Sequence, residues 1–515
     1  MESVDTAFPP RREWIRLGKR YREGKSSQDV AASQLLLTTT RKMESSLSAG
    51  KAWAQNLREL IGRIRELALN SANYRLPAPS IVPVARGDGL YRPIALLRNV
   101  EDRVICSQTA KYLRTQFDPD FMSSSYAFRV RRGKEPPPTH HDAVRDVERF
   151  RSENAGPLWV AECDIQSFFD AIHHDVAWRA FCDASGAAAR RGVAIDPRAV
   201  AVFSSFLNSY TFFGTAAPKA REWLEARGIQ GELKSPRRAL ENYYSRPESE
   251  RVGIPQGGAL SCLVANLVLH RADRAVATVM PSAHYARYCD DMVLLSTSRS
   301  DCDTAFQEYV RVLHELRLPC HPPRLWDGYS SGHWTGKSKN TYPWGPKRDG
   351  HVPWLSFVGY QVRHDGLFRV RKSTLQKELD KQERLADDTL QAVLAPSGHS
   401  SPKRAARSVH VIEFRLRSRL LAMSVGTRGI KQDPSRARSG CWSAGFPLLV
   451  ENRNIGAQMK LLDRGRQRQL LRVRRILGRT LAKRSATPRT DGASFWAPSH
   501  YGRPYSYFVA FQTAR

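Results

Sequence analysis

The sequence is poor in acidic residues and in long apolar runs. Its 515 residues hold 50 Asp and Glu against 81 Lys and Arg, a formal net charge of +31. A folded protein tolerates such an excess best when a polyanion shares it, so nucleic acid is the expected partner, with an anionic membrane surface as the alternative. No run of about 18 apolar residues exists to cross a membrane, and residues 1–5 lack the charged-then-apolar order of a signal peptide. We therefore expect a cytoplasmic protein without a membrane partner.

The sequence also lacks cysteine and histidine patterns that hold metals. None of the eight cysteines lies two residues from another, which argues against zinc and against a disulfide framework. We expect reduced thiols that act as small core residues: Cys106, Cys163, Cys182, Cys262, Cys289, Cys302, Cys320 and Cys441. The histidine pairs at 140–141 and 173–174 have no third ligand at helical spacing, and we interpret both as helix starts.

Three segments do carry a chemical pattern. Asp290 and Asp291 interrupt two short apolar runs over residues 285–295, which predicts a β-hairpin with an acidic tip. A second apolar strand, residues 158–163, ends in Asp164. Taken alone, paired aspartates in a turn are usually solvated. If the strands share one sheet, however, their carboxylates become neighbours that could hold two divalent metals for phosphoryl transfer.

The third segment is a Gly/Pro loop, residues 253–261, that leads into an apolar helix over 263–269. Gly257 and Gly258 lack a Cβ, so the backbone there can be approached closely by a ligand. Gln256 is the polar residue of this loop. Residues 183–252, which precede this loop, carry only weak signals, and we predict that they form an insertion.

In this order the three segments resemble the palm motifs of reverse transcriptases, especially the bacterial branch that contains group II intron enzymes. Residues 92–96, 125–129 and 357–362 resemble the fingers motifs and the primer-grip segment of the same family. The resemblance covers about residues 75–375. It implies an α+β right-hand polymerase: a basic helical N-terminal extension (1–75), fingers (76–157), a palm with an antiparallel sheet (158–365), and a helical basic thumb and C-terminal region (366–515).

The resemblance also implies roles for individual residues. Asp164, Asp290 and Asp291 become the catalytic carboxylates, and with Ile165 they form the site of two Mg²⁺ ions, with Mn²⁺ as an alternative. The expected nucleotide-binding residues are Arg86, Arg92, Phe169, Gln256 and Gly257. Those expected to contact nucleic acid are Arg129, Tyr288, Gly359, Tyr360, Arg472, Arg475 and Arg479.

Some of these assignments also follow from the residues themselves. Arg86 and Arg92 flank the turn at 87–89, so a hairpin would aim both guanidiniums the same way, and planar forks suit triphosphate oxygens. Residues 460–484 carry ten basic residues against one acid, with an apolar stripe between them, as a helix packed on one face and turned to a phosphate backbone on the other would.

Two further roles come from the family. The aromatic ring of Phe169 would exclude a 2′-hydroxyl, so the product should be DNA. The family often carries a lysine that protonates pyrophosphate, whereas the matching run here offers Arg324. Lys337, Lys339 and His321 are the other candidates for that role.

The predicted function is RNA-directed DNA synthesis by two-metal nucleotidyl transfer. Its partners would be dNTPs, a template RNA, expected to be a non-coding RNA, and the cDNA product. The layout resembles stand-alone bacterial enzymes of phage defence, and a homo-oligomer is left open. The alternatives are template-independent or protein-primed DNA synthesis, or a non-catalytic, maturase-like RNA-binding protein. The retained Asp164, Asp290, Asp291 and Phe169 argue against the last.

Overall fold

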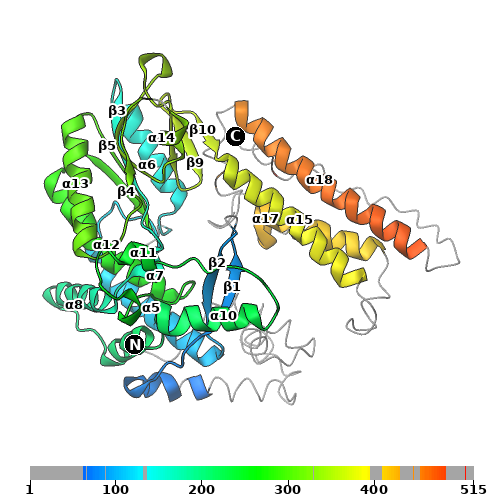
Figure 1. The fold of residues 1–515 in the computed structure, drawn as a ribbon, viewed down its shortest axis with the longest axis horizontal. Helices are drawn as coiled ribbons and strands as arrows, with labels where there is room; N and C mark the ends of the chain where they lie inside the picture. Colours follow the sequence, from blue (N-terminus) through cyan, green and yellow to red (C-terminus); the bar gives the residue numbers. More distant parts are fainter. Residues whose placement is uncertain are drawn as a thin grey trace. The chain divides into compact units, whose positions relative to one another are not determined.

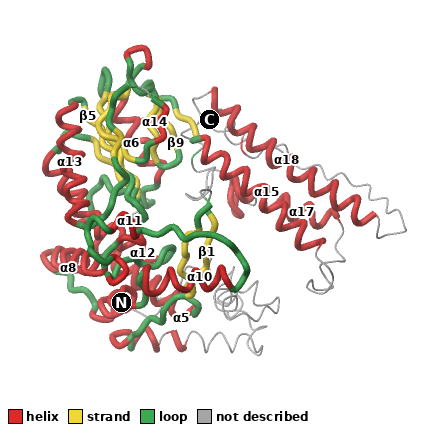
Figure 2. Tube along the Cα trace, in the orientation of Figure 1, coloured by secondary structure: helices red, strands yellow, loops and turns green. Residues whose placement is uncertain are grey.

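The computed structural model describes residues 62–64, 66–86, 89–130, 136–328, 330–394, 409–429, 445, 453–482 and 505. The chain divides into two compact units, a first unit of residues 1–138 and 159–342 and a second unit of residues 139–158 and 343–515. Each unit combines helices with a mainly antiparallel sheet (Figures 1 and 2). The predicted α+β class is therefore confirmed.

The first unit contains a five-stranded sheet in the order β4-β5-β3-β7-β6. Its strands are β3 (Leu158–Cys163), β4 (His284–Tyr288), β5 (Asp291–Ser296), β6 (Pro323–Arg324) and β7 (Ser338–Trp344). β5 pairs antiparallel with both β3 and β4, which confirms the predicted hairpin and the predicted apolar strand. β3 and β5 are apolar almost throughout because helices cover this sheet. α13 (Arg299–Glu315) packs against β5, and α12 (Ala259–Val279) packs against α13 (Figure 1).

The predicted insertion at 183–252 forms part of the main core instead. The core joins α5 (Val100–Phe117), α8 (His174–Arg190), α9 (Pro197–Asn208) and α12. Phe203 of α9 stacks on Phe181 of α8, with ring centroids 4.4 Å apart. The buried positions of α9 recur at helical spacing, at Ala199, Val202, Phe203 and Phe206. The segment thus contributes to the core. Its composition did not reveal the helical spacing of its buried residues.

A β-hairpin and a helix form a smaller cluster within the first unit. β1 (Ser80–Ala85) pairs antiparallel with β2 (Tyr91–Leu96) as predicted, and α10 (Ala217–Glu225) packs against β1. Ile81 of β1 is buried against Phe212 and Ala216. The hairpin is therefore anchored at its base by apolar contacts, while residues 87 and 88 of its turn lie outside the described part.

The second unit is built from a small sheet and long helices. β8 (Trp354–Phe357), β9 (Tyr360–Arg363) and β10 (Phe368–Val370) form an antiparallel sheet in the order β10-β9-β8, and α6 (His140–Glu153) packs against β9. α15 (Lys372–Leu394), α17 (Val409–Gly429) and α18 (Arg453–Ala482) pack on one another around Leu390, Leu416 and Val473. The helical C-terminal region is thus a three-helix assembly in its described part.

These units do not coincide with the predicted regions. Residues 139–158, expected in the fingers, and 343–365, expected in the palm, both belong to the second unit, because α6 packs on the β8–β10 sheet. Short elements complete the described structure: η3 (Ser71–Asn73), η4 (Asp118–Asp120), α7 (Phe168–Ala171), η5 (Phe212–Ala216), α11 (Arg237–Leu240), η6 (Pro247–Ser249), α14 (Ser331–Thr335) and η7 (Lys347–Asp349).

Both histidine pairs begin helices, as predicted. Thr139 caps α6 through a capping box with Asp142, and the His173 ring accepts a hydrogen bond from the Asp175 amide at the start of α8. Seven cysteines lie in the described residues and all are free thiols, whereas Cys441 lies outside them. No helix within the described ranges is both long and apolar enough to span a bilayer.

Candidate active site

The β3–β5 register brings the separated aspartates together. Cys163 pairs with Met292, so Asp164, one residue further, lies beside the turn that carries Asp290 and Asp291. Burial raises the pKa of the Asp290 carboxyl, and the neighbouring Asp164 raises it further while Arg92 acts in the opposite direction. Asp291 is exposed and the Asp164 side chain is 30% exposed. The carboxylates of Asp164 and Asp291 are thus accessible to solvent.

Cys289 forms the tight turn before the two aspartates. Its φ is +62°, in the left-handed region that costs a residue with a Cβ some energy. The thiol is buried, and burial raises its pKa. Its carbonyl oxygen accepts a hydrogen bond of 2.9 Å from Arg287. Cys289 is therefore a turn residue with a buried thiol, and Arg287 of β4 holds its backbone.

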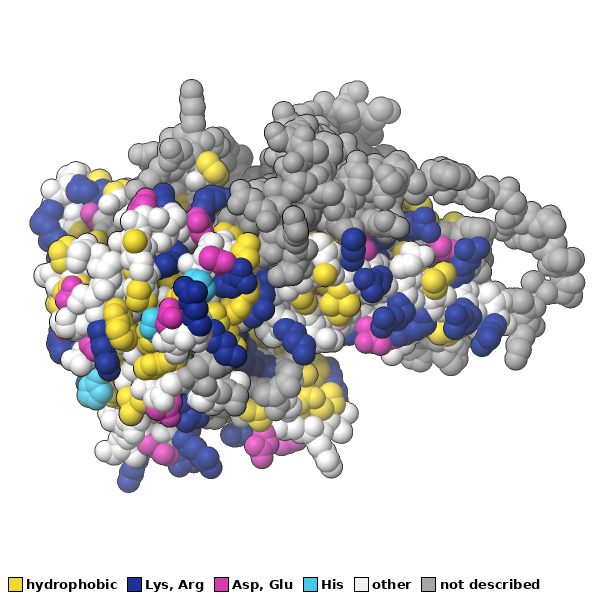
Figure 3. Space-filling view, turned by 90° about the horizontal axis from the view of Figure 1, so that it is seen from above, with side chains coloured by type: hydrophobic (Ala, Val, Ile, Leu, Met, Phe, Trp, Pro, Cys, Tyr) yellow, Lys and Arg dark blue, Asp and Glu magenta, His cyan; other side chains and the backbone are white. Residues whose placement is uncertain are grey.

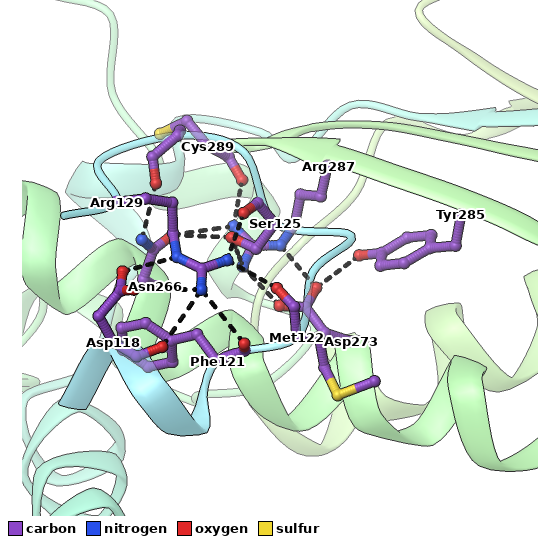
Figure 4. A network of polar contacts seen from close by, with 11 residues as sticks. Asp118, Phe121, Met122, Ser125, Arg129, Asn266, Asp273, Tyr285, Arg287 and Cys289 are labelled. Carbon is purple, nitrogen blue, oxygen red and sulfur yellow. Dashed lines mark hydrogen bonds and ion pairs between the residues drawn. The ribbon is translucent and has the colours of Figure 1, made fainter. Parts of the chain in front are cut away.

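The support of this turn is a buried polar network, drawn in Figure 4. The Arg287 guanidinium and the Asp273 carboxylate of α12 form an ion pair at 2.6 Å, and their side chains are 0% and 1% exposed. Tyr285 donates to Asp273 at 2.7 Å, and Arg287 donates to the Ser125 hydroxyl at 2.9 Å. Asn266 donates to the Ala127 carbonyl at 2.8 Å. The network ties the β4–β5 hairpin to α12 and to the loop at 125–127.

Arg129 belongs to the adjoining part of this network. Its guanidinium is buried and donates to Asp118 at 2.7 Å and to the carbonyls of Met122 and Ser125 at 2.7 Å each (Figure 4). These hydrogen bonds hold the loop that carries Arg129. The contact of Arg129 with nucleic acid stays a prediction.

The two phenylalanines after Asp164 have different environments. Phe168 is buried in the main core, whereas Phe169 is partly exposed at its edge, with ring centroids 5.1 Å apart. The Phe169 carbonyl accepts a hydrogen bond of 2.8 Å from Ile254, which ties it to the Gly/Pro loop. Of the two rings, Phe169 is the one that a ligand could reach.

Asp170, a residue for which no role was predicted, holds the Gly/Pro loop through Gln256. Gln256 is buried and donates to the Asp170 carboxylate at 2.7 Å. Burial raises the pKa of Asp170 from 3.8 to about 7, although Gln256, Arg92 and two further cations lower it. Gly257 has a φ of +92°, which favours glycine. The sequence gives no sign that Asp170, which follows the apolar strand, would be fully buried.

Arg86 and Arg92 lie on one face of the β1–β2 hairpin, as predicted. Val84 pairs with Arg92, and Arg86 follows Val84 by two residues, so the register gives all three side chains the same side. Arg92 acts electrostatically on both Asp170 and Asp290. The hairpin therefore presents cations to the acidic site.

Two basic residues flank Asp164. Its carboxylate oxygen is 3.7 Å from His321 Nε2 and 3.9 Å from Lys337 Nζ. Lys339 is instead buried in an ion pair of 2.7 Å with Glu162. Arg324 is exposed on β6. Of the residues considered for pyrophosphate protonation, His321 and Lys337 are the ones beside the catalytic acid.

The remaining predicted nucleic-acid contacts have different environments. Tyr360 is buried, with its hydroxyl 3.0 Å from His141 Nδ1, and Arg472 is ion-paired with Glu383 and Asp387 of α15. Tyr288 is partly exposed, Gly359 forms the β8–β9 turn with a φ of +90°, and Arg475 and Arg479 are exposed on α18. All six contacts stay predictions.

The side chains at the predicted metal site decide which ions it could hold. Across the described residues, no group of three or more His, Cys, Asp and Glu side chains is close enough to hold an ion. The donors at the end of β3 and at the β4–β5 turn are carboxylates, which suit a hard cation, and a cation would stabilise the charged form of Asp290. Ile165 is buried and pairs with Cys320 through the backbone. The donor chemistry fits Mg²⁺ or Mn²⁺.

Comparison with known proteins points to the same family. Residues 203–323 match the family of reverse transcriptase (RNA-dependent DNA polymerase), a range that holds the Gly/Pro loop and the Asp290–Asp291 turn but not Asp164. The chain is 24% identical over 266 residues to protein YkfC of Escherichia coli (strain K12), a match that covers 45% of this chain and 57% of that relative. The predicted family resemblance is confirmed.

Two solved telomerase structures were also compared. The Candida albicans telomerase in complex with a fragment of telomeric RNA is 10% identical, with a TM-score of 0.35, over 78% of this chain and 60% of that one. The apo telomerase of Candida tropicalis is 10% identical, with a TM-score of 0.36, over 84% and 69%. Scores this low carry no argument about fold or function.

Proposed function

We propose that this chain, whose residues 203–323 form a reverse transcriptase domain, is an RNA-directed DNA polymerase that extends a primer with deoxynucleotides. The observation that carries the proposal is the β3–β5 register, which sets Asp164 beside the Asp290–Asp291 turn. Phosphoryl transfer depends on positioning and on charge stabilisation more than on covalent chemistry. A rigid turn with adjacent carboxylates and facing cations supports that chemistry.

In this proposal Asp164, Asp290 and Asp291, with Ile165, would hold two Mg²⁺ ions, or Mn²⁺. Such ions, when bound, lower the pKa of an attacking hydroxyl and offset phosphate charge. The buried Cys289 thiol stays protonated because burial raises its pKa, so it offers no soft ligand. The carboxylates thus select hard cations.

The surrounding residues orient the substrate. Arg86 and Arg92 hold the triphosphate through planar forks. Phe169 blocks the space of a 2′-hydroxyl, and Gln256, fixed by Asp170, borders the nucleotide beside the Gly257 backbone. His321 and Lys337, next to Asp164, are the groups we propose to supply a proton to the departing pyrophosphate.

The biological setting is part of the same proposal. A template that is a non-coding RNA, a role in phage defence and a cytoplasmic location are supported by the sequence resemblance to stand-alone bacterial enzymes. The formal charge of +31 supports a nucleic-acid partner.

The test is a primer-extension assay with the purified chain, a primed RNA of defined sequence, Mg²⁺ and all four dNTPs, followed by sequencing of the product. DNA complementary to the RNA is expected. Homopolymeric or protein-linked DNA that ignores the template would favour the alternative of untemplated or protein-primed synthesis. A folded chain that binds RNA and incorporates no nucleotide on any template would support the maturase-like alternative.

A further inference from the structure

A short segment within residues 183–252, the predicted insertion, pairs with β2 and so extends the β1–β2 hairpin. The Tyr91 amide donates to the Glu232 carbonyl at 2.8 Å, and the Lys234 amide donates to the Tyr91 carbonyl at 2.9 Å. Tyr91 and Leu233 thereby form a parallel bridge. A Cβ on Gly231 would lie 2.3 Å from the Tyr91 ring, so the approach of this segment requires glycine at that position. Residues 232–234 are thus docked on β2 by the backbone.

The register of this bridge decides where Lys234 lies. Because Tyr91 pairs with Leu233, the next residues, Arg92 and Lys234, are neighbours and have their side chains on the same face. Arg86 is on that face as well, through the pairing of Val84 with Arg92. Three cations therefore share one face of the extended hairpin.

That face is directed at the candidate active site. Lys234 acts electrostatically on the buried Asp170, together with Arg92 and Arg86. It also acts on His321, whose ring lies 3.7 Å from the Asp164 carboxylate. Lys234 is itself only partly exposed. Arg86, Arg92 and Lys234 therefore form a cluster of three cations on one face of the extended hairpin, to which an anionic ligand can bind.

We infer that Lys234 is a third phosphate-binding residue, which binds the triphosphate of the incoming nucleotide alongside Arg86 and Arg92. The inference rests on the proposed function. A nucleoside triphosphate carries more negative charge than two guanidiniums offset, and an ammonium group acts as a compact third point charge. Residues 232–234 lie outside the segments whose residues were predicted to bind nucleotide, so the sequence alone did not assign Lys234 a role.

The test is single-nucleotide primer extension by wild type and by the Lys234→Ala variant, with KM for dNTP and kcat measured separately. The KM for dNTP should rise by about tenfold in Lys234→Ala and by much less in Lys234→Arg, which keeps the charge. The KM for the primed template should not change. Lys111→Ala, which removes an exposed lysine on α5, is the matched control and should leave all these values unchanged.

A second measurement uses inorganic tripolyphosphate as the probe. It should inhibit wild type in competition with dNTP, and calorimetric binding to the full chain should weaken about tenfold in Lys234→Ala. Lys234→Gln, which keeps the backbone bonds of the segment, replaces the alanine variant if that one fails to fold.

The outcomes separate this inference from the proposed function. Wild type that makes complementary DNA while Lys234→Ala keeps its KM for dNTP would overturn the inference alone. A higher KM for primed template with an unchanged KM for dNTP would indicate that Lys234 contacts the nucleic-acid backbone and not the triphosphate. That result would also overturn the inference. If wild type makes no DNA the proposed function fails, and equal binding of tripolyphosphate by wild type and variant would then overturn the inference independently.

Discussion

At the scale of single residues, burial separates the side chains that can act from those that hold the fold. Arg129 and Tyr360 sit in family-like motifs, yet both side chains are buried on partners within the chain. Their partners, Asp118 and His141, lie 11 and 219 residues away, and sequence spacing gives no sign of such pairs. Asp164 and Asp290 could be predicted because short apolar runs indicate the strands beside which they lie.

Asp170 gives a prediction at this scale. In the folded chain its pKa is about 7 against 3.8 ordinarily, so the folded state binds a proton more tightly than the unfolded state. That stabilisation is complete below about pH 4 and is lost as the pH rises through about 7. The groups that face Asp170 are Gln256, Arg92, Lys234, Arg86 and Tyr210.

We expect Asp170→Asn to remove this pH dependence, since asparagine can still accept the Gln256 hydrogen bond without a charge. The free energy of unfolding of wild type, relative to the variant, should fall by at most about 3 kcal/mol from pH 5 to pH 8. Urea denaturation of both proteins at each pH measures it, and their difference cancels other titrating groups. If the difference in unfolding free energy between the two proteins does not vary with pH, burial does not raise the pKa of Asp170.

At the scale of elements, the β4–β5 hairpin depends on α12, the helix that precedes it in the sequence, through a buried ion pair. β4 and β5 could be predicted from apolar runs around a polar turn, and α12 from the apolar run after the Gly/Pro loop. The Arg287–Asp273 ion pair that joins them could not, because an arginine within a strand is usually exposed. The same holds for residues 232–234, whose pairing with β2 uses backbone groups that every sequence offers.

Removing one partner of that buried pair should be costly. Arg287→Met leaves the Asp273 charge uncompensated in the core, and we expect a loss of about 3–5 kcal/mol in the free energy of unfolding. The double variant Arg287→Met, Asp273→Leu should lose clearly less than the sum of the two single variants. Urea denaturation followed by circular dichroism measures all three.

The matched control is Arg311→Met, which breaks an ion pair with Glu308 on the exposed face of α13 and should leave stability nearly unchanged. Additive losses in the double variant would show that Arg287 and Asp273 do not depend on each other.

At the scale of the whole molecule, charge is the dominant property. Figure 3 shows Lys and Arg side chains spread over the described face in view, with fewer Asp and Glu side chains among them. On α18, Arg475 and Arg479 are exposed, whereas Arg472 is engaged by Glu383 and Asp387. The composition could predict a polyanionic partner, but it could not separate exposed arginines from paired ones on one helix.

RNA affinity should therefore fall steeply with salt, and the loss of exposed arginines should reduce that dependence. For Arg475→Gln, Arg479→Gln we expect the slope of log K against log salt to decrease in magnitude by about 1 to 2, since each phosphate contact contributes about 0.7 to 0.9. Arg472→Gln on the same helix is the control and should change the slope little. Filter binding at four salt concentrations measures it, and equal slopes in all three proteins would mean that this face of α18 binds no phosphate.

The most direct test of the account is nucleotide incorporation by Asp290→Asn on a primed RNA template, with RNA affinity and thermal unfolding measured in parallel. Loss of a carboxylate that stabilises the transition state should lower kcat by at least about a hundredfold, while RNA binding and folding stay intact. Asp303→Asn, on the partly exposed side of α13, should retain full activity. Incorporation by Asp290→Asn at a near wild-type rate would contradict the assignment of the β4–β5 turn as the active site.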